Sequence, residues 1–235
     1  MYKLRDYQQS AVDATLHHFR RCHEPAVIVL PTGAGKSLVI AELARLAKRK
    51  ILVLTHVKEL VEQNVQKFRQ YADAKQIKAG VYSAGLNLKQ TDFQVTFASV
   101  QSVARNLSQF ATAYSLVIID ECHRVAQIDS SETPQGQYGQ IVSQLKAHNP
   151  EVKILGLTAT PYRMGLGWIY QYHTRGQVRT EEPRFFRDCI FELPIRYLLD
   201  ENFLTPARMM DAPVLSYDFS QLKPANTGRY KEAEM

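Results

Sequence analysis

The segment 26–37 constrains the fold of this chain more than any other. It opens with five apolar residues, Ala26-Val27-Ile28-Val29-Leu30, whose β-branched side chains favour a buried parallel strand. A glycine-rich turn ending in Gly-Lys-Ser follows, Pro31-Thr32-Gly33-Ala34-Gly35-Lys36-Ser37, and apolar residues then recur at helical spacing through residue 46. A strand, a glycine loop and a helix in this order are the context that a phosphate-binding loop requires.

The loop also predicts the chemistry of the site. Gly33 and Gly35 let the backbone curl so that several N–H groups face one anion, and the positive end of the next helix adds to the attraction. We expect Lys36 to reach the β- and γ-phosphates of ATP and the Ser37 hydroxyl to bind Mg²⁺. The strict pattern has a small residue where Leu30 stands, and a structural turn with a chance lysine is the alternative. The remaining nucleotide-binding candidates in the loop are Pro31, Thr32 and Ala34.

Composition limits the class of protein. The 235 residues suffice for one large domain or two small ones, and the net charge of +6 is compatible with a polyanionic partner without establishing one. The three cysteines, Cys22, Cys122 and Cys189, are far apart and form no Cys-x-x-Cys, which fits a reducing compartment and argues against a zinc site. With no signal-peptide pattern at the start and no membrane-spanning run, we expect a cytoplasmic protein and no membrane partner.

A second diagnostic stretch is the apolar run 116–119 followed by Asp120-Glu121-Cys122-His123. Buried strands rarely end in paired acids for stability alone, because both carboxylates must be solvated or paired. We expect Asp120 to hold Mg²⁺ through its water shell and Glu121 to polarise the water that attacks the γ-phosphate. His123 could report on the γ-phosphate side of the site.

Polar residues also follow the other predicted strands, 51–55, 93–98 and 152–157. Such residues face the ligand crevice of an open α/β sheet, although ordinary capped helix starts are the alternative. Near the start of the chain, Asp6 could cap a helix and the Gln8 amide could bond an adenine edge, although a surface glutamine is the alternative. The candidates after the strands are His56, Lys58, Ser99, Gln101, Arg105, Thr158 and Thr160.

Taken in order, these motifs resemble the amino-terminal motor half of superfamily 2 helicases, in the DEAD/DEAH-like group. The residues that carry the resemblance are Tyr7-Gln8, Gly33 to Ser37, Thr55 to Leu60, Asp120 to His123 and Thr158-Ala159-Thr160. Longer segments, 27–46, 116–124, 156–170 and 186–205, are similar to the RadD family, which acts in bacterial DNA double-strand-break repair. The similarity covers nearly the whole chain.

This resemblance implies a RecA-like α/β domain, a doubly wound and mainly parallel sheet with helices on both faces, that binds ATP and Mg²⁺ and grips DNA. It assigns Arg5 and Gln8 to adenine, and Thr158 and Thr160 to coupling hydrolysis with strand movement. It places the nucleic-acid path along the segments 56–58 and 99–105. Single-strand-binding and recombination proteins are partners by analogy only.

The domain expectations follow from where the alternation of strands and helices stops. We expect one domain over 1–214, with a last strand at 207–214, and a polar linker over 215–235 toward a second RecA-like domain. In the family that second domain supplies arginines to the γ-phosphate, so we expect this chain to be a fragment that binds nucleotide but hydrolyses it very slowly. We expect a polar turn at 87–92 and a surface loop at 125–140.

The stretch 161–188 interleaves arginines with aromatic residues, a composition that suits single-stranded nucleic acid. We therefore expect Arg163 and Trp168 to contact DNA or the second motor domain. The alternative is that the aromatic rings pack in a small core of their own while the arginines face water.

Four functions are open at this point. A nucleic-acid-dependent ATPase accounts for all the motifs, and the motor subunit of a restriction-type nuclease shares them. A P-loop kinase has no reason to keep Asp-Glu-Cys-His and Thr-Ala-Thr in this order. A non-catalytic nucleotide- or DNA-binding fragment is the last reading, which the intact Lys36 and Glu121 oppose for the parent protein.

Overall fold

The structure, a computed structural model, describes residues 3–71, 77–125 and 136–206. Its strands are β1 (Ala26–Val29), β2 (Ile51–Thr55), β3 (Ala79–Ser83), β4 (Leu88–Lys89), β5 (Val95–Ser99), β6 (Leu116–Asp120), β7 (Lys153–Thr158), β8 (Tyr162–Arg163), β9 (Gly167–Trp168), β10 (Tyr170–His173) and β11 (Phe186–Glu192). Nine strands form one sheet in the order β10-β11-β1-β7-β6-β2-β5-β3-β4, and β8 and β9 form a separate hairpin. All neighbours in the large sheet are parallel except β3 and β4.

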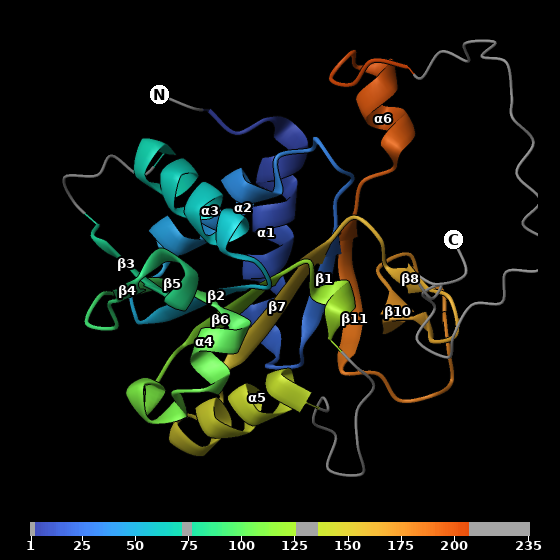
Figure 1. Cartoon of the computed structure of the whole chain (residues 1–235). Coiled ribbons are helices and arrows are strands. Elements are labelled where there is room, and N and C mark those ends of the chain that lie inside the picture. Colours follow the sequence, from blue (N-terminus) through green and yellow to red (C-terminus); the bar gives the residue numbers. More distant parts are fainter. Residues whose placement is uncertain (1–2, 72–76, 126–135, 207–235) are drawn as a thin grey trace, which may run out of the picture.

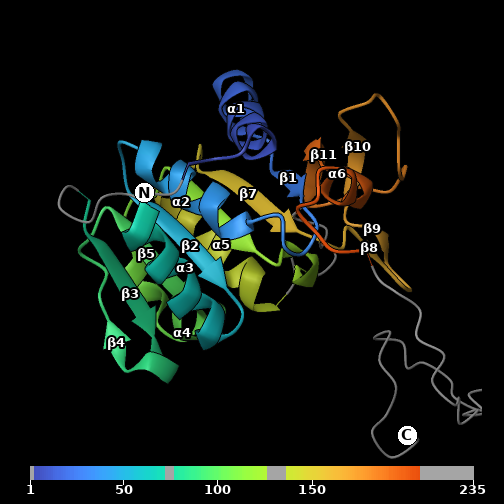
Figure 2. The ribbon, with the colours of Figure 1, turned by 90° about the horizontal axis from the view of Figure 1, so that it is seen from above.

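Helices cover both faces of this sheet (Figures 1 and 2). They are α1 (Asp6–Arg21), α2 (Lys36–Leu46), α3 (Lys58–Tyr71), α4 (Val100–Ala104), α5 (Gly136–His148) and α6 (Ile195–Asp200), with short 3₁₀ turns η1 (Ala84–Leu86), η2 (Leu107–Phe110) and η3 (Cys122–Arg124). Because side chains alternate along a strand, Ile28 of β1 joins the core under α1, α2 and α3, while Val27 and Val29 join the core under α4 and α5. The fold is therefore the doubly wound, mainly parallel RecA-like sheet that the sequence predicts.

The strand order positions the site. β1 lies between β11 and β7, and β6 lies on the far side of β7. Since these strands are parallel, the loops that follow β1, β6 and β7 leave the sheet at the same edge. The glycine loop, the acidic motif and the threonine motif follow those three strands.

Several local expectations are corrected by the structure. No strand was expected at 186–192, yet β11 lies beside β1; the charged residues Arg187 and Asp188 interrupt the apolar pattern that would have revealed it. The expected turn 87–92 contains β4, which pairs with β3. Helix α5 begins at residue 136, inside the expected loop, because glutamines and glycines dilute its apolar pattern.

The start of α1 also differs from expectation. Its N-cap is Arg5, and Asp6 is the first helical residue instead of the cap. The expected strand 207–214 and linker 215–235 lie outside the described residues. None of the helices in the described ranges is both long enough and apolar enough to cross a bilayer.

Candidate nucleotide site

The glycine loop between β1 and α2 has the conformation that its sequence predicts. Gly33 and Gly35 have φ of +83° and +79°, values that side-chain-bearing residues rarely adopt. Gly35 is the N-cap of α2, whose first residue is Lys36. A Cβ atom on Gly35 would lie 2.5 Å from Nε2 of Gln8. This position therefore needs glycine for its backbone angle and for the close approach of α1.

The first turn of α1 holds this loop in place. The Tyr7 hydroxyl donates to the Ala34 carbonyl at 3.0 Å, and Gln8 Nε2 donates to the same oxygen at 2.8 Å. Gln8 Oε1 accepts from the Arg5 backbone N–H at 2.9 Å, and the residue is only 2% exposed. Both ends of the Gln8 amide thus bond the chain itself, so any contact with adenine must share these groups.

The Arg5 side chain has a different environment. Its guanidinium lies 3.8 Å from the centroid of the Phe203 ring, beyond the end of α6, and the residue is exposed. Leu204 lies against the loop, because a Cβ on Gly33 would be 2.8 Å from its Cδ2. The segment after α6 therefore packs beside the loop, and the adenine roles of Arg5 and Gln8 stay predictions.

The loops after β1, β6 and β7 meet through one chain of polar contacts. Lys36 Nζ lies 3.5 Å from Glu121 Oε1, and His123 Nδ1 lies 3.3 Å from Glu121 Oε2. His123 Nδ1 is also 3.0 Å from Thr158 Oγ1, which accepts from the Thr160 N–H at 3.0 Å. The structure therefore brings the predicted phosphate, acidic and coupling residues into one cluster.

Glu121 is strained and ionised in this cluster. Its φ of +52° places a side-chain-bearing residue in the left-handed region, which costs on the order of 1 kcal/mol and is typical of functional sites. The hydrogen bond with His123 lowers the pKa of Glu121, and the positive charge of Lys36 lowers it further against the effect of burial. At neutral pH it is an ionised hydrogen-bond acceptor, as a group that orients a water must be.

Asp120 is the buried member of the acidic pair. It is 5% exposed, its Oδ2 accepts from Asn64 Nδ2 at 3.0 Å, and its Oδ1 accepts from the Glu121 N–H at 3.1 Å. Burial raises the pKa of Asp120, opposed by the hydrogen bond from Asn64. A cation would relieve this buried charge, and the carboxylate of Asp120 and the hydroxyl of Ser37 are the oxygen donors that Mg²⁺ prefers.

Asn64 is a functional candidate that the sequence analysis missed. It lies on α3, which is remote in sequence from Asp120 but packs over the same edge. A signal existed, because Asn64 interrupts the apolar face formed by Val61, Val65 and Phe68. A polar residue on a buried helix face needs a partner, and here that partner is the acidic strand tip.

We expect Asp120→Asn to stabilise the protein when neither nucleotide nor Mg²⁺ is present. The folded-state pKa of Asp120 lies above its unfolded value, so stability falls as the pH rises through that interval, and at pH 7 the cost of burying this carboxyl group opposes folding. An amide accepts from the Glu121 N–H and donates to Asn64 once that side chain rotates. The expected gain is about 1 kcal/mol, or about 2–4 °C in Tm.

Thermal unfolding of both proteins at pH 7 and at acid pH checks this expectation. The gain should shrink below the ordinary aspartate pKa, where the wild-type carboxyl is protonated as well. A variant that melts below the wild type at pH 7 would contradict it.

The β8–β9 hairpin is joined to the acidic motif. Arg163 Nη1 donates to the His123 carbonyl at 3.1 Å, a link that the sequence analysis did not foresee. Trp168 is half-buried between the Tyr162 and Tyr170 rings, and the Arg179 guanidinium lies 4.4 Å from the centroid of the Trp168 ring. This packing agrees with the alternative of a small aromatic core, and the contacts of Arg163 and Trp168 with DNA stay predictions.

The other nucleic-acid candidates lie along the same sheet edge. β2 and β5 are neighbours, with Thr55 opposite Ser99, so the residues that follow them come together. Lys58 and Arg105 are exposed, whereas Ser99 is buried and its hydroxyl donates to Ser102 at 2.7 Å. The half-buried candidates of this group are His56 and Gln101.

A glycine loop and an acidic strand tip joined across a threonine-bearing strand define the nucleotide-binding lobe of a superfamily 2 helicase-like motor. Residues 1–163 match the family model described as "Type III restriction enzyme, res subunit", and the chain belongs to this ResIII family. None of the matches reported below points specifically to RadD.

Known proteins agree with this assignment. The chain is 32% identical over 161 residues to the DNA 3'-5' translocase XPB2 of Sulfurisphaera tokodaii, covering 68% of this chain and 31% of that one. It is 25% identical over 171 residues to the type I restriction enzyme SsaAORF53P endonuclease subunit of Staphylococcus saprophyticus, covering 67% and 17%. The UvsW helicase of bacteriophage T4 shares the fold, with a TM-score of 0.53 and 22% identity over 68% of this chain and 54% of that one. The chain thus spans less than a third of the XPB2 translocase and of the restriction subunit.

Proposed function

We propose that this chain is the ATP-binding motor lobe of a DNA-dependent ATPase that couples ATP hydrolysis to translocation on DNA or to its remodelling. The observation that carries the proposal is the 3.5 Å contact between Lys36 Nζ and Glu121 Oε1. It joins a phosphate-binding loop to an acidic strand tip across the strand that lies between them. Phosphoryl transfer depends on this kind of positioning and charge neutralisation more than on covalent chemistry.

The residues divide the work as follows. Lys36 exchanges its partner Glu121 for the β- and γ-phosphates when ATP enters, which frees the Glu121 carboxylate to orient the attacking water. Ser37 and Asp120 would hold Mg²⁺, which neutralises phosphate charge when bound. Asn64 positions Asp120 by its hydrogen bond.

The same contacts connect the nucleotide site with the β8–β9 hairpin. His123 touches both Glu121 and Thr158, and Arg163 holds the His123 carbonyl. A change at the γ-phosphate therefore reaches the β8–β9 hairpin through two contacts, from Glu121 to His123 and from His123 to Arg163. We place DNA along the exposed residues that follow β2 and β5, because Lys58 and Arg105 supply phosphate-binding charge there.

The parent protein would contain a second RecA-like domain, reached through a linker, that completes the site with arginines. Such arginines are worth about 10³–10⁵ in rate, so this chain alone should turn over ATP very slowly. By resemblance we extend the proposal to bacterial DNA repair in the manner of RadD, in the cytoplasm, with single-strand-binding and recombination proteins as partners.

A motor subunit of a restriction-type nuclease is the second candidate. It is supported by the ResIII family match and by the relative from Staphylococcus saprophyticus. Such a subunit would use the same lobe to move along DNA toward a cleavage event.

ATP turnover of the full-length protein, with and without single-stranded DNA, tests the proposal. We expect DNA to stimulate turnover several-fold or more, and equal rates with and without DNA would reject a DNA-dependent motor. Incubation with closed circular DNA and ATP separates the two candidates, because only the restriction-type subunit would cut the circle.

A further inference from the structure

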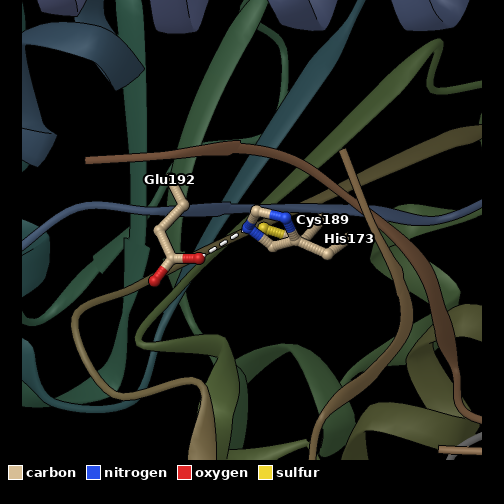
Figure 3. A group of neighbouring side chains, drawn as sticks. All are labelled: His173, Cys189 and Glu192. Carbon is tan, nitrogen blue, oxygen red and sulfur yellow. Dashed lines mark hydrogen bonds and ion pairs between the residues drawn. The ribbon is translucent and has the colours of Figure 1, made fainter. Parts of the chain in front are cut away.

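Three side chains with different donor atoms converge at the edge of the sheet farthest from β4 (Figure 3). They are His173 at the end of β10 and Cys189 and Glu192 on β11. One ligand atom from each lies within 4.8 Å of the others, and His173 Nε2 is 2.6 Å from Glu192 Oε2. His173 and Cys189 are buried, and the Glu192 side chain is 29% exposed.

A bulge in β11 creates this convergence. Val27 pairs with Cys189 and Ile28 pairs with Phe191, so Ile190 is an extra residue in the ladder. Val29 then pairs with Glu192. Since Val27 and Val29 point to the same face of β1, their partners Cys189 and Glu192 also share a face, which residues three apart on a regular strand do not.

The neighbouring strand completes the group. His173 lies directly opposite Cys189 in the β10–β11 pair, so its imidazole faces the same point. Bulges that re-aim side chains are common next to functional sites. No residue of the nucleotide site takes part.

We propose that His173, Cys189 and Glu192 bind one zinc-class transition-metal ion. An imidazole nitrogen, a sulfur and a carboxylate oxygen are the three donor types that Zn²⁺ takes from proteins, whereas Mg²⁺ and Ca²⁺ take oxygen alone. Three protein ligands leave the fourth tetrahedral position to water. The ion would cross-link β10, the edge strand, to β11.

Small movements suffice to accept the ion. Two tetrahedral ligands about 2.0–2.1 Å from zinc are about 3.3 Å apart, so the 2.6 Å contact between His173 and Glu192 must open. The half-exposed Glu192 side chain is free to make that shift. The charge also balances, because one thiolate and one carboxylate neutralise a divalent ion in a buried place.

Proton positions follow from the hydrogen bonds. The Arg175 N–H donates to His173 Nδ1 at 3.1 Å, so Nε2 carries the ring proton and donates it to Glu192. When the ion binds Nε2, the ring proton moves to Nδ1, and the Arg175 N–H turns to water in its exposed turn. The Cys189 thiol, whose pKa burial raises to about 12, loses its proton to solvent. One proton is therefore released for each ion bound.

Solvent reaches the group at Glu192, whose side chain is 29% exposed. A cavity of about 780 Å³ lies on the opposite face of the sheet, between α1 and β11, and the residues that line it include His173, Cys189 and Cys22. Cys22 lines the same cavity but is not one of the three converging groups. It is therefore the matched control for Cys189.

The test is metal titration of the whole 235-residue chain. With Co²⁺ as the probe, we expect one ion per chain, a sulfur-to-metal charge-transfer absorption and release of one proton. Cys22→Ser should keep that absorption and Cys189→Ser should lose it. Zinc measured by elemental analysis after dialysis against buffered Zn²⁺ should show one ion per chain, lost in the same variant.

The absorption separates this site from Asp120, which has no thiolate to offer. Glu192→Gln is the second variant, in case Cys189→Ser does not fold. Circular dichroism confirms its fold, and its affinity for Zn²⁺ should fall at least about tenfold, the effect expected even of groups that only orient a ligand. Three results would each overturn the proposal and leave the group a hydrogen-bonded structural cluster. They are failure of the wild type to bind one ion, an absorption that survives in Cys189→Ser, and unchanged affinity in folded Glu192→Gln.

Discussion

Glu121→Gln is expected to lower ATP turnover of the full-length protein by about 10²–10⁴-fold, the usual contribution of a positioned general base. The amide keeps the size of the side chain but cannot accept a proton from water. Nucleotide affinity should be unchanged or higher, because Lys36 loses the carboxylate 3.5 Å away that competes with phosphate for its charge. The variant should therefore bind ATP and fail to hydrolyse it.

Separate measurements of turnover and of ATP affinity check this split. Glu151→Gln is the matched control, since Glu151 is exposed in the turn before β7, at the end of that strand away from the cluster. It should leave both quantities unchanged. Turnover of Glu121→Gln within about threefold of the wild type would remove the general-base role from the mechanism.

Lys36→Ala is expected to abolish the stabilisation of this chain by Mg²⁺ and ATP. In the wild type, ligand at a hundred times its dissociation constant adds about 2.7 kcal/mol, or about 5–11 °C in Tm for a domain of this size. Without the ammonium group the triphosphate loses its central positive contact, and the shift should fall to near zero. The unliganded Tm should fall only modestly, because the Glu121 carboxylate keeps His123 as its partner when Lys36 is removed.

Thermal unfolding with and without Mg²⁺ and ATP measures this effect. Lys146→Ala on α5 is the matched control, because Lys146 is exposed on the opposite face of the sheet and should leave the shift intact. A full ligand-induced shift in Lys36→Ala would show that the nucleotide binds somewhere other than the glycine loop.

The parts of the site that the sequence predicts are those that one short stretch encodes. Gly33 to Ser37 combine a strand end, a turn that requires glycine and a helix start, so the residues carry their own structural context. The acidic tip after β6 is similar, since an apolar run ending in Asp120 and Glu121 can be read without its neighbours. The RecA-like sheet follows because such strands and helices alternate.

What the sequence does not predict depends on contacts between distant segments. Asn64 and Arg163 matter through partners 56 and 40 residues away, at Asp120 and His123. The Gln8 amide is a plausible base reader in sequence, yet the fold engages both of its ends.

The cysteine spacing predicts no zinc site, an expectation with which the proposed metal site stands in conflict. It argues against zinc because no two cysteines are near in sequence, whereas the proposed site has only one cysteine. The other ligands are supplied by a strand pairing and a bulge in β11 that the charged residues of this strand conceal.

The position of β11 beside β1 has a consequence for the order in which the molecule is made. The strand that precedes the nucleotide loop is synthesised before both of its partners, and one of these follows only about 160 residues later. Until then one edge of β1, a strand of four apolar residues, has unpaired backbone groups that can pair with another chain. The family match ends at residue 163. A polypeptide trimmed to that limit would keep every nucleotide-binding motif and still lack β11, the strand that pairs with β1.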